Sequence, residues 1–191
     1  YILGESVKKI EVRGYKAKYI VTDKQTYEAD YVVVNADYAF AETNFLDEAY
    51  QTFNQKYWDK ATIAPSGFIM YLGLNKQIEQ LRHHTLVLHD WQEHFDKIFD
   101  NPGWPEKPSY YICNPSKTDD VAPEGKENLF VLVPMASGLD DTDMKRNQYA
   151  EQILADIEKT IGISISNDID YKRIFSHRDF TNDYNAFKGT A

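Results

Sequence analysis

Alternating apolar and polar positions predict strands in the first part of the chain. Residues 6–12 (SVKKIEV) and 16–22 (KAKYIVT) alternate with a period of two, and the turn signal 13–15 (RGY) separates them. The run 31–34 (YVVV) is continuously apolar instead, which is typical of a strand covered on both faces. The pattern predicts a small antiparallel meander leading into a buried strand, which ends at 35–37 (NAD).

From residue 38 onward, helical and strand patterns follow one another irregularly. The predicted helices are 38–60, 77–81, 91–99 (capped by Asp90) and 142–161, and the predicted strands are 67–74, 85–88, 110–113, 129–133 and 169–176. Helix 142–161 is the clearest, because Tyr149, Ile153 and Ile157 share one face and Gly162 ends it. We therefore expect an α+β fold, with a mixed, largely antiparallel sheet and helices packed on it.

Three of the predicted strands carry apolar residues at alternating positions. These residues are Phe68, Met70, Leu72, Tyr110, Ile112, Phe130 and Leu132. Their alternation gives each strand one continuous apolar face. An ordinary sheet packed on helices is the simpler interpretation, and the wall of a long apolar pocket is the alternative.

Composition and charge narrow the possible partners. The chain has a net charge of −9 and no run of Lys and Arg longer than a pair, so binding to nucleic acid is not expected. Its single cysteine, Cys113, excludes an internal disulfide and favours a reducing compartment. No apolar run reaches the roughly 20 residues that span a bilayer. The chain starts at Tyr1 and stops at Ala191 within patterned sequence, which suggests an interior segment of a longer protein.

Four histidines lie close together in the sequence, but their spacing does not predict a metal site. His83 and His84 should point in opposite directions on a strand. His89 and His94 are too far apart in sequence to share one helical face. Cys113 is expected to behave as a small buried hydrophobe. We expect structural or surface histidines and no metal.

Motifs of a self-contained catalyst are missing. The chain has no GxSxG elbow and no phosphate-binding P-loop. It also lacks the run GxGxxG, which lets a pyrophosphate approach a helix N-terminus. A complete dinucleotide-binding domain is therefore not expected within these 191 residues.

One long segment has a distinctive order of motifs. Residues 107–134 (KPSYYICNPSKTDDVAPEGKENLFVLVP) combine Pro-Ser, an aromatic strand, a second Pro-Ser, an Asp, Ala-Pro-x-Gly and an apolar strand ending in Pro. Segments 6–37, 66–74 (SGFIMYLGL) and 185–191 (NAFKGTA) flank it. In this order the segments resemble the phytoene desaturase family, in particular its dehydrosqualene (diapophytoene) desaturase branch. The resemblance covers nearly the whole chain.

The resemblance implies part of a flavoprotein with an amine-oxidase-like architecture. Residues 1–37 would belong to the FAD-binding domain, 38–176 would form the substrate-binding domain, and 177–191 would begin the return to the FAD-binding domain. FAD would lie between the substrate-binding domain and a Rossmann-like domain that is mostly outside this chain. This segment alone is expected to be inactive.

The same resemblance implies an oxidoreductase of carotenoid biosynthesis. Its FAD would accept electrons from carbon–carbon bonds of a long polyene precursor, of the dehydrosqualene or phytoene type. Relatives are cytoplasmic and bind membranes peripherally. Two alternatives stay open, namely a related polyene oxidoreductase, such as a retinol-saturase-like enzyme, and a stand-alone lipid-binding or interaction module.

Seven positions match family segments near cofactor or substrate. Val7 would contact the adenine side of FAD through its backbone, and Asn35 and Ala36 match a turn near the cofactor. The candidate walls of a substrate tunnel are Phe68, Met70, Leu72 and Tyr110. No residue is assigned as a catalytic acid or base.

Overall fold

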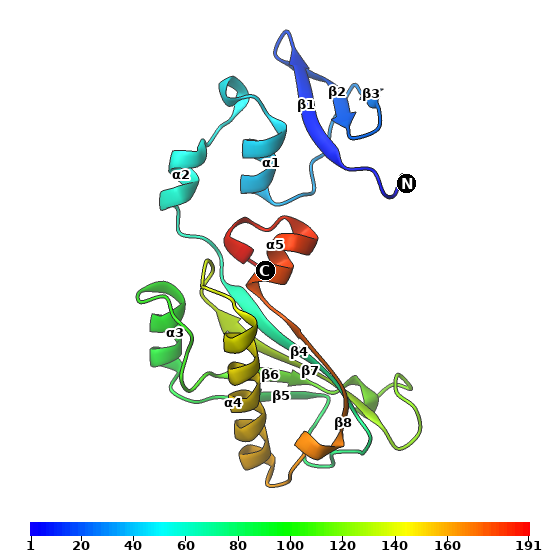
Figure 1. Ribbon diagram of the computed structural model, residues 1–191, viewed down its shortest axis with the longest axis vertical. Helices are drawn as coiled ribbons and strands as arrows, with labels where there is room; N and C mark the ends of the chain where they lie inside the picture. The colour runs from blue at the N-terminus through cyan, green and yellow to red at the C-terminus, as the bar shows by residue number, and fades with distance from the viewer. The chain divides into compact units, whose positions relative to one another are not determined.

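The computed structural model describes all residues, 1–191, and divides into two compact units (Figure 1). The first unit comprises residues 1–62 and 183–187, and the second comprises 63–182 and 188–191. The boundary therefore follows Thr62 rather than Asp37. It is displaced because the first helix packs on the first strand of the meander and belongs with it.

The first unit is an antiparallel meander with short helices. Its elements are β1 (Val7–Arg13), β2 (Lys16–Thr22), β3 (Thr26–Glu28), α1 (Tyr38–Phe45), the 3₁₀ turn Glu48–Tyr50 and α2 (Gln55–Lys60). The sheet order β1-β2-β3 confirms the predicted meander. The single helix expected over 38–60 is broken instead. Buried Glu42 accepts hydrogen bonds from the backbone N–H groups of Thr52 (2.8 Å) and Phe53 (3.0 Å), which folds this segment back on α1.

The buried strand predicted at 31–34 is not formed. This segment has no strand pairing, and the side chains of Tyr31 and Val33 are 91% and 92% exposed. A strand needs a partner for its backbone groups, but this segment pairs with no strand, and a cavity lies between it and the edge strand β1. An apolar sequence alone therefore did not suffice to make a strand here.

The second unit is a five-stranded sheet with helices. Its elements are β4 (Ser66–Leu74), β5 (His84–Val87), α3 (Trp91–Phe99), β6 (Tyr110–Cys113), β7 (Glu127–Met135), α4 (Asp143–Ile161), β8 (Ile169–Phe175) and most of α5 (His177–Tyr184), with 3₁₀ turns at Pro115–Lys117 and Ser166–Asp168. The end of α5 and the start of the 3₁₀ turn Phe187–Gly189 belong to the first unit. The strand order is β5-β6-β7-β4-β8, and every neighbouring pair is antiparallel. The α+β class is confirmed.

One predicted helix of this unit, 77–81, is a turn instead. The buried Glu127 carboxylate accepts a hydrogen bond from the backbone N–H of Ile78 (3.0 Å) and another from the Asn114 amide (2.7 Å). Lys117 forms an ion pair with the same carboxylate at 2.6 Å. These contacts hold residue 78 in a turn against β7, so the apolar spacing of the segment does not produce a helix.

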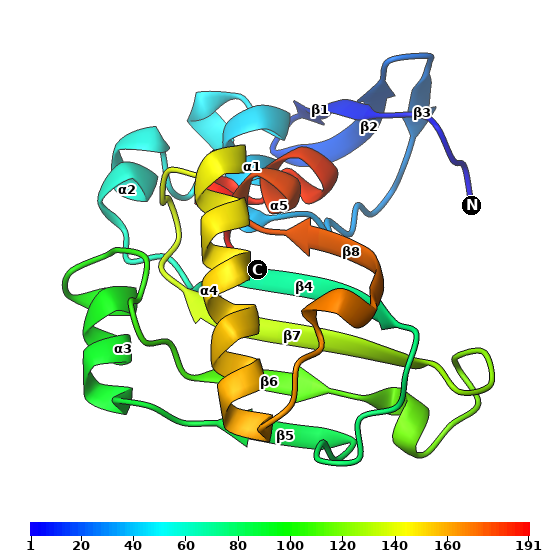
Figure 2. The same ribbon diagram turned by 60° about the horizontal axis from the view of Figure 1, so that its bottom comes forward.

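Helix α4 covers one face of the five-stranded sheet (Figure 2). Thr142 caps its start by accepting a hydrogen bond from the Lys145 N–H, and Gly162 ends it with a φ of 75°. The predicted apolar stripe of α4 is buried against the alternate residues of β4, β6 and β7. None of the helices combines the length and apolar character required of a bilayer-spanning segment.

A buried ion-pair cluster fixes the first turn of α4. The Arg146 guanidinium is 7% exposed, forms a two-point contact with the carboxylate of Asp141 and lies 2.8 Å from that of Asp179. Burial acts to raise the pKa of Asp141, but hydrogen bonds from Arg146 and from the Arg178 backbone outweigh it, so this pKa is lowered overall. The cluster joins α4 to the loop before it and to α5.

Candidate functional site

A cavity of about 420 Å³ opens in the first unit, where β1 faces the irregular segment 32–36. The three residues that the sequence connects with a cofactor, Val7, Asn35 and Ala36, all line this cavity. They are far apart in sequence, and the fold of the meander brings them to one place. Whether they contact FAD stays a prediction.

The lining of this cavity suits a flat apolar group. Its walls include Ile10, Ile20 and Phe40, and Lys8 is the only cationic side chain in it. Because β1 is an edge strand, a row of its backbone groups has no partner in the sheet and is available to a ligand. The predicted contact of Val7 with the adenine side of FAD would use such backbone groups, while the diphosphate needs a glycine-rich turn that this chain lacks.

The structure places the predicted tunnel residues in the hydrophobic core. Phe68, Met70, Leu72 and Tyr110 are at most 2% exposed and lie in the same buried cluster as the apolar stripe of α4. The Phe68 ring meets the edge of Tyr149 at a centroid distance of 5.0 Å. This burial favours the simpler of the two interpretations of the alternating strands for these four residues.

The opposite face of the same strands is aromatic and only partly covered. Phe130 and Leu132 lie on the face opposite Met70, because Met70 is paired with Val131 in the β4–β7 ladder. Tyr71 is 40% exposed, stands opposite Phe130 in the register and lies 5.5 Å from its ring. We call the group Ile69, Tyr71, Tyr111, Phe130 and Leu132 the open face.

A hollow of about 410 Å³ lies on the open face. Tyr71, Phe130, Tyr171 and Pro115 are among the residues that line it. Strand alternation could not identify this face in advance, since both faces of β4 and β7 carry apolar side chains. The position of α4 decides which face is sealed.

The histidines are arranged differently from the prediction. The rings of His83 and His84 lie side by side, with centroids 4.2 Å apart, because His83 precedes β5 and strand alternation does not apply to it. Cys113 is half-buried rather than part of the core. His94 is a structural histidine, since its ring accepts from the Ser109 N–H (3.0 Å) and donates to the Pro134 carbonyl (2.8 Å).

Comparison with known families identifies the fold and the cofactor class. Residues 1–191 match the family described as flavin containing amine oxidoreductase. The chain belongs to this family. The family is flavin-containing, which confirms the class of cofactor expected from the sequence.

Individual members of the flavin containing amine oxidoreductase family agree with the predicted branch. The chain is 52% identical over 168 residues to a carotenoid 3,4-desaturase of Haloarcula japonica, covering 87% of this chain and 34% of that protein. It is 35% identical over 167 residues to a 4,4'-diapophytoene desaturase of Methylomonas sp, covering 84% and 32%. The predicted resemblance to carotenoid desaturases is confirmed, and the chain spans about a third of the length of these curated relatives.

The fold also has a solved counterpart. An oxidoreductase from Methanosarcina mazei superposes with a TM-score of 0.56 at 19% identity, over 91% of this chain and 37% of that one. At this identity the likeness supports the shared fold alone.

Proposed function

We propose that the protein containing this chain is an FAD-dependent desaturase that oxidises carbon–carbon single bonds of a long polyene. The observation that carries the proposal is the 52% identity to a carotenoid 3,4-desaturase over 168 residues. Bound flavin would accept the two electrons as a hydride, while a proton leaves the neighbouring carbon and a C=C bond forms. The substrate would be of the dehydrosqualene or phytoene type.

We place the polyene against the open face of the second unit. A conjugated chain offers no charge and almost no hydrogen-bonding group, so apolar and aromatic surfaces must position it. The open face supplies such a surface, with the rings of Tyr71 and Phe130 in tilted contact across neighbouring strands. The four buried residues of the α4 side would support this wall from behind without touching the substrate.

The test is desaturation of defined precursors by the complete natural reading frame. The protein would be produced in cells that make either phytoene or dehydrosqualene, and products would be separated and identified by their absorption spectra. We expect Tyr71→Ala and Phe130→Ala to lower the yield of desaturated product at least about tenfold, by loss of transition-state positioning. Met144→Ala is the matched control, because Met144 is apolar, 67% exposed and far from the open face in sequence.

The outcomes separate the three readings of the family resemblance. Desaturated products support a carotenoid desaturase. Flavin-bound protein that converts a different polyene supports a related oxidoreductase, such as a retinol-saturase-like enzyme. Protein without flavin that still binds a polyene supports a lipid-binding module and contradicts our proposal.

We assign Val7, Asn35 and Ala36 to the flavin side. Replacing Ala36 with Leu would fill the cavity that it lines, and we expect the purified protein to lose most of its bound flavin absorbance. Ala29→Leu is the control, since Ala29 is in the same unit and outside that cavity's lining. Equal flavin content in both variants would contradict the assignment.

We propose peripheral membrane contact from the cytoplasmic side through α3. Trp91, Phe95 and Phe99 are 50%, 37% and 46% exposed, and their spacing of four residues places them on one side of this helix. The rings of Trp91 and Phe95 are 4.7 Å apart. Aromatic side chains favour the interface between water and lipid. A free thiol at Cys113 agrees with the reducing side of the membrane.

Vesicle flotation tests this contact. We expect the full reading frame to float with zwitterionic phosphatidylcholine vesicles and the double variant Trp91→Ala/Phe95→Ala to stay in solution. Because Glu93 and Asp96 on the same helix repel anionic lipid, we expect less protein to float with anionic vesicles. Met144→Ala should float like the unchanged protein, and equal flotation of the double variant would contradict the proposal.

A further inference from the structure

Three metal-ligating side chains converge at one end of the β5–β6 strand pair. The ligand atoms of His83, His84 and Cys113 all lie within 4.8 Å of one another. The ladder explains this convergence, since His84 stands directly opposite Cys113 in the antiparallel register. The backbone N–H of Asn114 donates to the His83 carbonyl at 2.8 Å, which holds His83 beside the pair although it precedes the strand.

The ring of His83 is held with one nitrogen free. Its Nδ1 lies 2.7 Å from the Thr118 hydroxyl, and that hydroxyl donates its proton to Asp119 at 2.7 Å. Thr118 can therefore only accept from Nδ1–H, which leaves the lone pair on Nε2 of His83. Histidines that bind metals are oriented in this way by a hydrogen bond at the other ring nitrogen.

The ring of His84 is held by an equivalent contact. Its Nδ1 lies 2.5 Å from the hydroxyl of Tyr111. This contact engages Nδ1 and orients the ring, so Nε2 is the nitrogen that remains for a metal ion.

We propose that His83, His84 and Cys113 bind one thiophilic metal ion of the zinc class. Two imidazole nitrogens and one thiolate are ligands that Zn²⁺ prefers, and the fourth tetrahedral position is left for water. No carboxylate belongs to the cluster, so Ca²⁺ and Mg²⁺ are disfavoured. The site adjoins the open face, since Cys113 is paired with Phe130 in the β6–β7 ladder, but the proposal does not rest on the desaturase function.

The geometry requires only a small closure of the side chains. Zinc bond lengths to nitrogen and sulfur place tetrahedral ligand atoms about 3.3–3.6 Å apart. The ligand atoms already lie within 4.8 Å, and rotation of the two half-exposed or exposed imidazoles shortens the remaining gap. On binding, the Cys113 thiol loses its proton to solvent as the S–Zn bond forms, so binding should weaken as the pH falls.

The test is titration of the full natural reading frame with Co²⁺ and Zn²⁺ in reducing buffer. With Co²⁺ we expect one ion per chain and the near-ultraviolet charge-transfer band of a thiolate ligand. Cys113→Ala should abolish the band and weaken Zn²⁺ binding at least about tenfold. His84→Ala should weaken Zn²⁺ binding to the same extent. Thr118→Val should weaken Zn²⁺ binding about tenfold, because the His83 ring loses the contact that orients it.

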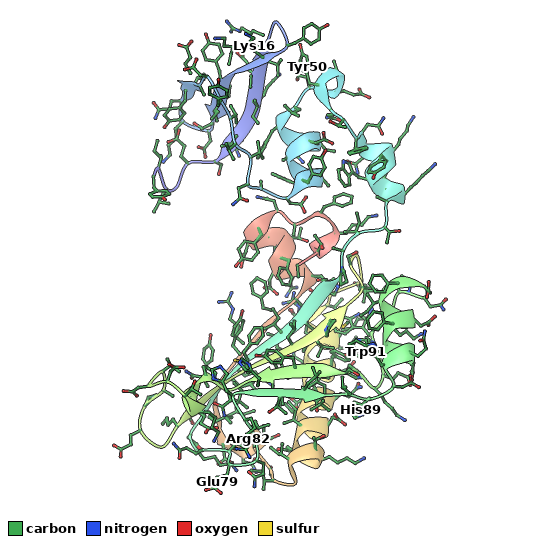
Figure 3. The ribbon with its side chains drawn as sticks, turned by 180° about the vertical axis from the view of Figure 1, so that it is seen from behind. Lys16, Tyr50, Glu79, Arg82, His89 and Trp91 are labelled. Atoms are coloured by element: carbon green, nitrogen blue, oxygen red, sulfur yellow. The ribbon has the colours of Figure 1, made fainter.

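The control variant is His89→Ala. Arg82 lies next to the cluster, before the start of β5, whereas His89 follows the other end of this strand (Figure 3). The His89 ring contacts the Asp156 carboxylate and not the cluster. We expect it to bind Zn²⁺ like the unchanged protein. Co²⁺ binding without a charge-transfer band, or Zn²⁺ binding of equal affinity in Cys113→Ala, would overturn the proposal. Either result would indicate adventitious binding to surface imidazoles.

A second measurement avoids substitutions. Cys113 is the only cysteine, so alkylation by iodoacetamide reports on this site alone. Stoichiometric Zn²⁺ should slow the alkylation at least about tenfold by occupying the thiolate. Alkylation at an unchanged rate would overturn the proposal even if a variant failed to fold.

Discussion

The two faces of the five-stranded sheet are formed by the same strands but differ in burial. On the face beneath α4, alternate residues such as Phe68 and Met70 are fully buried. On the open face, Tyr71 and Phe130 keep part of their rings exposed beside a hollow. A difference of one residue along β4 therefore separates a residue that stabilises the fold from one that is available to a ligand.

The sharpest way to test this comparison is to truncate one aromatic residue on each face. Phe68→Ala should lower the free energy of unfolding by about 3–5 kcal/mol, because it leaves a cavity between β4 and α4. Tyr71→Ala, three positions along the same strand, should cost about 1 kcal/mol or less. Urea unfolding followed by circular dichroism measures both, and equal losses would show that the two faces are not different.

The attachment of α4 to the sheet gives the next largest effect. Arg146→Ala should destabilise the protein by about 3 kcal/mol, since it leaves the carboxylate of Asp141 buried without its main partner. Lys145→Ala removes an exposed pair with Asp140 and should cost less than about 1 kcal/mol. If the two variants unfold at the same urea concentration, the buried cluster does not hold the covered face.

The same cluster predicts how stability depends on pH. The folded-state pKa of Asp141 lies below the ordinary value of about 3.9 for an aspartate, so its contribution to stability is present above that pH and is lost as the pH falls through the lowered folded-state pKa. One proton contributes a slope of at most about 1.4 kcal/mol per pH unit. The free energy of unfolding, measured from pH 5 to pH 2, should therefore fall less steeply in Arg146→Met than in the unchanged protein. Identical slopes would contradict the assignment of this pH dependence to Asp141.

The smallest expected effect comes from two phenols that face the covered side. The Tyr149 hydroxyl is buried without a hydrogen-bond partner, so Tyr149→Phe should be neutral or stabilising by up to about 1 kcal/mol. Tyr110 instead donates to Asp156 at 2.7 Å, and Tyr110→Phe should cost about 1 kcal/mol. A loss of stability in Tyr149→Phe would mean that its hydroxyl has a partner, such as an ordered water.

Local sequence determined most of the elements of this protein. The period-two runs became β1 and β2, and the stripe between Thr142 and Gly162 became α4 with both predicted ends. Helix α3 begins after Asp90 as expected, because the Asp90 carboxylate accepts a hydrogen bond from the Glu93 N–H. Motif order in 107–134 identified the relatives. Each of these features depends on backbone preferences or caps within a few residues, which a sequence pattern records directly.

Tertiary contacts decided everything that depends on a distant neighbour. The run 31–34 has the composition of a buried strand but pairs with no strand, and Glu42 breaks a helical pattern by binding the backbone of Thr52 and Phe53. The placement of α4 chose which alternate residues became core, and the register of β5 on β6 set His84 against Cys113. A period of two assigns residues to two faces of a strand but does not say which face is buried, because burial depends on what packs on each face.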